Sequence, residues 1–165
     1  MTALTAVDWA LPAAPGLIAD MRARLRAARL PASAVAGWEG GVNLEWLSGL
    51  IPFDEAVGDG GLHVALPAGV PDGRMPILLL HGWPSSGLEY AQVAAQLEQA
   101  GLYPIVADLP GFGFSAPTAA PVGPRQIAVI LRRALKQGLS IDSFAVHGND
   151  WGATVAGWLA ADHAD

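Results

Sequence analysis

Apolar and polar residues follow one another in short blocks from residue 62 onward, and these blocks predict alternating strands and helices. The strand blocks are 62–66, 76–81, 103–107 and 141–147. The unbroken apolar run Ile77–Leu80 is typical of a strand that is buried on both faces of a sheet. Helices are predicted over 86–100, 124–138 and 153–161. Repeated strand–helix units favour the α/β class, with a mostly parallel sheet and flanking helices.

The segment 1–58 lacks this alternation and predicts an N-terminal helical arm. Pro15 fits the first turn of a helix that runs to about Leu30. Its four arginines indicate a solvated face rather than a nucleic-acid patch. A second helical segment is expected between Trp38 and Leu50. The chain is therefore divided into an N-terminal region, 1–58, and an α/β region, 59–165.

Composition narrows the classes of protein that fit this pattern. Hydrophobic residues make up 52% of the chain and charged residues only 15%. An average globular protein has about 25% charged residues, so the low value suits a well-covered sheet. The net charge of −6 argues against a nucleic-acid partner. The absence of cysteine excludes disulfides and thiolate metal sites.

The lengths of the apolar stretches and the sequence of the N-terminus indicate where in the cell the protein is expected. Apolar stretches are shorter than the roughly 20 residues of a membrane span. The N-terminus does not have the pattern of a secretory signal. A cytoplasmic protein without cofactor, metal or membrane span is expected.

The segment Gly148-Asn149-Asp150-Trp151-Gly152 lies between the last predicted strand and the last predicted helix. Small residues around a central nucleophile at such a turn are typical of a nucleophile elbow. A carboxylate is a poor nucleophile toward esters, because the anhydride reverts. It can attack a saturated carbon with a strained or good leaving group, which indicates an epoxide or a carbon–halogen bond. The alternative is that Asp150 is a plain helix N-cap.

Two further loops follow predicted strands. The segment His81-Gly82-Trp83-Pro84 is expected to supply the Trp83 N–H to an oxyanion hole, together with the Trp151 N–H, while His81 shapes the loop. An ordinary strand-to-helix loop is the alternative. The segment 108–115 contains glycines that allow sharp turns. Its aromatics, Phe112 and Phe114, are expected to line an apolar pocket.

These three segments, in this order, resemble those of the epoxide hydrolase branch of the α/β-hydrolase superfamily. The N-terminal region is similar to that of the microsomal-type enzymes. The resemblance implies an α/β-hydrolase fold in which Asp150 attacks a small apolar epoxide, and water then releases the diol. Trp83 and Trp151 would supply the oxyanion-hole N–H groups. Haloalkane dehalogenases share the aspartate elbow, but Trp83 favours the epoxide reaction. The motif positions that complete the resemblance are His81, Gly82, Pro84, Gly148 and Gly152.

The family's catalytic histidine, its acidic partner and the lid tyrosines come after the elbow helix. His163 is expected roughly 20 Å from Asp150 along that helix, at a rise of about 1.5 Å per residue, and at the surface. His147 is expected to pack locally. The chain is thus expected to be an N-terminal half that lacks the cap and the C-terminal half, with no turnover alone. The bare edge of the elbow strand is expected to promote self-association. A non-catalytic interaction domain or a decayed relative, and a haloalkane dehalogenase fragment, remain as alternatives.

Overall fold

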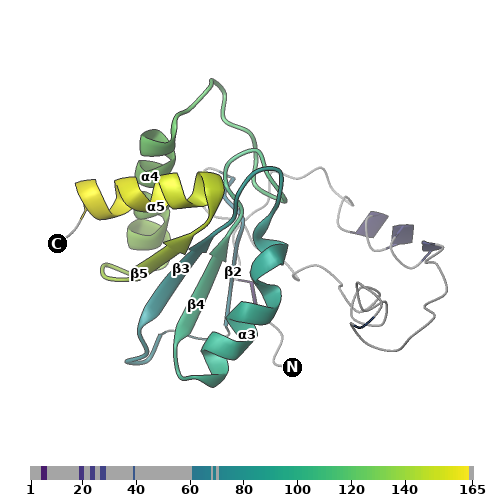
Figure 1. Cartoon of the computed structure of the whole chain (residues 1–165), viewed down its shortest axis with the longest axis horizontal. Coiled ribbons are helices and arrows are strands. Elements are labelled where there is room, and N and C mark those ends of the chain that lie inside the picture. Colours follow the sequence, from purple (N-terminus) through teal and green to yellow (C-terminus); the bar gives the residue numbers. More distant parts are fainter. Residues whose placement is uncertain are drawn as a thin grey trace.

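The computed structural model of the chain describes residues 5–6, 19–20, 23–24, 27–28, 39, 61–67, 69 and 71–163. Within these residues the chain forms strands, α-helices, one 3₁₀ turn and one π-helical turn (Figure 1). In order they are β1 (Thr5–Ala6), β2 (Val64–Leu66), β3 (Pro76–Leu80), the 3₁₀ turn η1 (Gly87–Tyr90), α3 (Ala91–Gln99), β4 (Tyr103–Ala107), α4 (Pro124–Arg133), the π-helical turn η2 (Ala134–Gly138), β5 (Ala145–Gly148) and α5 (Asp150–Asp162).

The described strands form one sheet in the order β1-β2-β4-β3-β5. β3 is parallel to both β4 and β5, whereas β2 runs antiparallel to β4, and β1 antiparallel to β2. The predicted mostly parallel α/β sheet is therefore confirmed. β5, which leads into the elbow, pairs with β3 alone among the described strands, so it forms one edge of this sheet.

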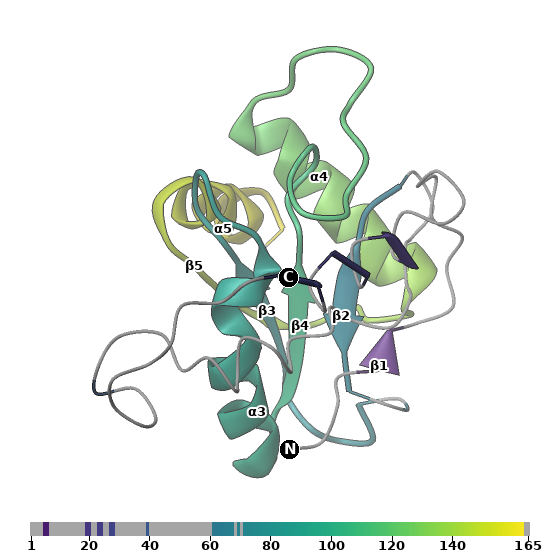
Figure 2. The same cartoon turned by 90° about the vertical axis from the view of Figure 1, so that its right-hand side faces the viewer.

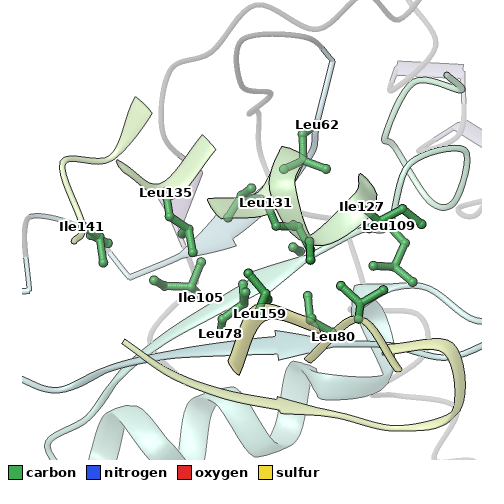
Figure 3. Packing of buried hydrophobic residues seen from close by; sticks show 14 of the residues in the cluster. Leu62, Leu78, Leu80, Ile105, Leu109, Ile127, Leu131, Leu135, Ile141 and Leu159 are labelled. Carbon is green, nitrogen blue, oxygen red and sulfur yellow. The ribbon is translucent and has the colours of Figure 1, made fainter. Parts of the chain in front are cut away.

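Helices cover both faces of the sheet, as the two views in Figures 1 and 2 show. Alternate residues of β3 point to opposite faces: Leu78 and Leu80 pack with α4 and α5, and Leu79 packs with α3. All three are at most 1% exposed. Figure 3 shows the larger core, on the α4–α5 face. The apolar run 77–80 is thus explained by burial on both faces.

Two predicted boundaries are wrong, at residues 141 and 153, whereas the helix predicted over 86–100 is present. Residues 141–144 are not strand, because the chain still wraps the end of η2: the Ile141 N–H donates to Leu135 O at 2.9 Å. Ile141 is a buried loop residue that packs in the core, so its apolar side chain did not indicate a strand. The last helix begins at Asp150 rather than at residue 153. The helix predicted over 86–100 begins as η1, with the Ser86 hydroxyl accepting from the Leu88 N–H, and continues as α3.

Only part of the predicted N-terminal region is described. Ala19, Asp20, Ala23, Arg24 and Ala27 are helical, and an exposed ion pair joins Arg24 to Asp20 at 2.8 Å, one helical turn apart. The remainder of the predicted helix to Leu30, most of the arm between Trp38 and Leu50, and the boundary at residue 58 lie outside the described residues. Among the helices that the structure describes, none has the length and apolar character needed to cross a bilayer.

Candidate active site around Asp150

Asp150 stands at a strained turn between β5 and α5. It is the first residue of α5, and its φ of 46° lies in the left-handed region, which costs a non-glycine residue free energy. The residue in the N-cap position is Asn149. The side chain of Asp150 reaches across the site instead, where Oδ1 accepts the Trp83 N–H at 2.8 Å. The alternative of Asp150 as a plain N-cap is therefore wrong.

Two glycines allow the elbow to approach the loop after β3. A Cβ on Gly152 would collide with the backbone oxygens of Leu80 and His81, so α5 can start against β3 only with glycine here. A Cβ on Gly148 would collide with the Gly152 backbone. The first turn of α5 therefore sits directly on the carboxyl end of β3. This contact brings the Asp150 carboxylate within reach of the Trp83 N–H.

Hydrogen bonds keep the Asp150 carboxyl group ionised. The N–H of Trp83, and after it that of Trp151, lowers the pKa of Asp150 below its ordinary value, and desolvation opposes them less strongly. The N-terminal dipole of α5 acts in the same direction as the two N–H groups. The arrangement gives an exposed carboxylate that accepts the Trp83 N–H and is also influenced by the Trp151 N–H. Such a group can act as a nucleophile and can keep one oxygen stabilised while charge develops on it.

His81 joins the loops that follow β3 and β4. It is 0% exposed, and its Nε2 accepts the Leu109 N–H at 2.9 Å, which places the ring proton on Nδ1. Nδ1 then donates to Gly82 O at 2.9 Å. Both ring nitrogens are engaged, so the ring cannot exchange protons at Asp150 without losing a bond. Trp83 and Pro84 follow, joined by a cis peptide bond, and the Trp83 side chain is 67% exposed.

A buried carboxylate organises the loop after β4, and the sequence analysis did not identify it. Asp108 Oδ1 accepts the Gly87 N–H at 2.6 Å, while Oδ2 accepts from the Phe114 N–H at 2.9 Å and bonds His63 Nδ1 at 2.6 Å. Burial raises the pKa of Asp108, but the bond to His63 and the two N–H groups outweigh burial and hold the pKa below its ordinary value. The available signal was an aspartate directly after a buried strand, at the head of a glycine-rich loop.

Phe112 and Phe114 are half-buried and stand against two histidine rings. Phe112 lies edge-on to His81, with ring centroids 5.4 Å apart, and Phe114 lies edge-on to His63 at 5.2 Å. Their expected place in the wall of a substrate pocket stays a prediction.

A hollow lies at the start of α5, with Asp150 as one of its lining residues. It has a volume of about 190 Å³ and is lined by Pro124, Asp150, Trp151 and Thr154. Pro124 and Thr154 were not identified from the sequence. Thr154 could have been found from its spacing, because it lies one helical turn after Asp150. Pro124 is far away in sequence and reaches the site only through the packing of α4 on α5.

The two remaining histidines lie away from the carboxylate. The His147 ring stands edge-on to the ring of Tyr90 in η1, with centroids 5.8 Å apart, so the expected local packing is confirmed. His163 follows the last turn of α5, at the end opposite Asp150. It is half-buried rather than at the surface, and its Nε2 is buried without a hydrogen-bond partner among the described residues. Among the described residues, neither ring forms a hydrogen bond with Asp150.

Comparisons with known proteins agree with this architecture. The profile of the alpha/beta hydrolase fold family matches residues 75–165, more than half of the chain. A juvenile hormone epoxide hydrolase of Manduca sexta is 38% identical over 93 residues, covering 52% of this chain and 20% of the relative. A proposed epoxide hydrolase of Stigmatella aurantiaca is 30% identical over 174 residues, covering 87% of this chain and 39% of the relative.

A solved structure of a proposed epoxide hydrolase from Pseudomonas aeruginosa superposes with a TM-score of 0.55 at 34% identity, covering 62% of this chain and 34% of that one. The chain therefore spans well under half the length of these relatives. The chain belongs to the alpha/beta hydrolase fold family, and the relatives it resembles within that family are epoxide hydrolases.

Proposed function

We propose that this chain carries the nucleophile and the oxyanion hole of an epoxide hydrolase, and that Asp150 opens an epoxide through an ester intermediate. The observation that carries the proposal is the position of the Asp150 carboxylate, which accepts the Trp83 N–H at 2.8 Å from a strained elbow. A helix cap or a structural ion pair needs no such strain. The names of the similar proteins support the substrate class.

In the first step, Oδ2 of Asp150 attacks one ring carbon while Oδ1 stays bonded to the Trp83 N–H. The new bond joins Oδ2 to carbon, and the bond between that carbon and the ring oxygen breaks. The ring oxygen leaves as an alkoxide and takes a proton from a general acid or from water. The product is a hydroxyalkyl ester of Asp150. Relief of ring strain drives this step, and a carboxylate kept ionised by its two donors is ready for it.

In the second step, water attacks the carbonyl carbon of that ester, and the negative charge collects on Oδ1. The N–H groups of Trp83 and Trp151 both interact with this carboxyl group, so they can stabilise the tetrahedral intermediate without reorganisation. The step needs a base that takes a proton from the attacking water. The intermediate then collapses by breaking the bond between Cγ and the ester oxygen, which releases the diol and restores the Asp150 carboxylate. The chain has four histidines. His63 and His81 are buried and hydrogen-bonded to other groups. His147 packs on Tyr90, and His163 lies at the far end of α5 from Asp150. We infer that the ester accumulates when these 165 residues act alone.

The test is intact-mass measurement of the purified 165-residue chain after incubation with excess propylene oxide at pH 7. The expected result is one added epoxide mass, mapped by peptide sequencing to Asp150. Asp150→Asn is the matched control, since it keeps the size and one acceptor oxygen but loses the nucleophile. Circular dichroism of both proteins establishes that each is folded.

Each other outcome contradicts a different part of the proposal. An equal mass increase in Asp150→Asn would assign the reaction to another residue. Diol formation well beyond one equivalent would show that a base is present after all. Halide release from a haloalkane, without an epoxide adduct, would identify a dehalogenase. Specific self-association with no adduct would favour a non-catalytic interaction domain.

A further inference from the structure

The hollow lined by Pro124, Trp151 and Thr154 also has Asp150 in its lining, so it is a candidate for the part of the substrate that does not react. Apart from Asp150 its lining is uncharged: a proline ring, an indole and a threonine. Charged substituents would find no partner there, and an anionic one would be repelled by the ionised Asp150. An uncharged, largely apolar substituent fits this lining.

We propose that this hollow binds the apolar substituent of a terminal epoxide, and that Thr154 and Pro124 set the size that is accepted. The proposal rests on Asp150 being the nucleophile. The hollow has a volume of about 190 Å³. A cavity of about 150 Å³ is large enough to hold benzene in another protein. A phenyl ring or a branched alkyl group of that size therefore fits.

Each wall of the hollow is held by contacts at the start of its own helix. Thr154 lies on α5, one turn from Asp150, and its hydroxyl reaches back to Asp150 O at 3.5 Å. Pro124 opens α4, where the Gly123 N–H donates to Gln126 Oε1 at 2.9 Å. The neighbouring residue, Arg125, then ties the start of α4 to α5.

Arg125 forms a two-point contact with the last turn of α5. Its Nε donates to Asp162 Oδ2 at 2.6 Å, and a terminal nitrogen donates to Asp162 Oδ1 at 3.0 Å. The guanidinium carbon also lies 4.8 Å from the centre of the Trp158 ring. A bidentate contact of this kind fixes geometry as well as adding energy, so it holds the two helices at a defined spacing. A wall of fixed size can discriminate between substituents.

The test compares the rates at which phenyloxirane and methyloxirane alkylate Asp150, measured by intact mass. The quantity of interest is the phenyl-to-methyl rate ratio, because it cancels changes that affect both reagents equally. Thr154→Phe should lower this ratio about tenfold or more, since the added ring occupies the hollow in which the phenyl group would otherwise lie. Val129→Phe adds the same ring at an exposed position of α4 and should leave the ratio unchanged. An unchanged ratio in a folded Thr154→Phe protein would overturn the proposal.

A second variant covers the case in which Thr154→Phe does not fold. Thr154→Ala enlarges the hollow and should raise the rate with naphthyloxirane relative to phenyloxirane severalfold. No rise would overturn the assignment of Thr154. Absence of alkylation by every reagent in the unaltered, folded chain would overturn the proposed function itself, and the substituent site with it. Alkylation of the unaltered chain with ratios that no Thr154 variant changes would overturn the substituent site alone.

Discussion

Substituting Gly82 by alanine tests whether the distance between the loop after β3 and the elbow controls reactivity at Asp150. A Cβ at position 82 would lie 2.6 Å from Asp150 Cβ and 3.1 Å from Oδ1. Nonbonded carbons prefer a separation of about 3.5–4.0 Å, so one side must move by roughly 1 Å. The bond from the Trp83 N–H to Oδ1 is 2.8 Å long before this movement. The movement lengthens it beyond the range of a good hydrogen bond.

Two effects of this movement oppose each other. Displacement of a reacting group by about 1 Å costs on the order of 100-fold in rate. Loss of the N–H bond raises the pKa of Asp150 and makes the carboxylate more nucleophilic. With a Brønsted slope of about 0.5, as for thiolates, that gain is only about threefold per pKa unit. Displacement therefore wins, and Gly82→Ala should be alkylated by methyloxirane roughly 30-fold more slowly than the unaltered chain.

The assay is the rate of Asp150 adduct formation, with a thermal melt to report folding. Gly157→Ala is the matched control, because a Cβ there meets nothing within 4 Å. That substitution should leave the alkylation rate unchanged and stabilise α5 by about 0.5–1 kcal/mol. Gly82→Ala alkylated at the unaltered rate, with an unaltered melting temperature, would refute the argument that the close approach positions the nucleophile.

Two further results are expected. Asp108→Asn should destabilise the fold by about 2–3 kcal/mol in a urea melt, because the amide NH₂ would face at least one of the donors on His63, Gly87 and Phe114. Asp72→Asn, in an exposed turn, is the control and should not destabilise the fold. The depressed pKa of Asp108 means that its stabilising contribution is complete above the ordinary carboxylate pKa and is lost as pH falls through the folded value. The alkylation rate should stay level as pH falls from 7 to 5 and decline only below the ordinary aspartate pKa of 3.8, because the N–H groups of Trp83 and Trp151 depress the pKa of Asp150. A midpoint above pH 4 in folded protein would contradict that assignment.

Those parts of the fold that depend on local pattern were predictable from the sequence. β3 and β4 were located almost to the residue, because runs such as 77–80 are apolar only when both faces are buried. β5 was predicted to begin at Ile141 rather than at Ala145, since apolar character does not distinguish a buried loop from a strand. The antiparallel direction of β2 could not be predicted from the sequence, because strand direction depends on the path of the connecting chain rather than on composition.

The candidate site was predictable where one short segment contains it. The elbow at Asp150 could be read from its neighbours, and the loop carrying Trp83 from its place after a strand. The partners of Asp108 come from three separate segments, and no pattern within one of them predicts the others. Pro124 likewise enters the hollow only through helix packing.

The bond between Trp83 and Asp150 joins positions 67 residues apart, and this separation bears on how the site forms during synthesis. Closing a loop of that length costs about 4 kcal/mol in chain entropy by logarithmic scaling, which one exposed hydrogen bond does not offset. The parallel pairing of β5 with β3 must therefore bring the two ends together. Because the ribosome synthesises the N-terminal part first, β3 and β4 can pair before residue 150 has been synthesised. The nucleophile then acquires its N–H partners in the same event that docks β5 and α5, so a reactive Asp150 reports that the last described strand has been added in register.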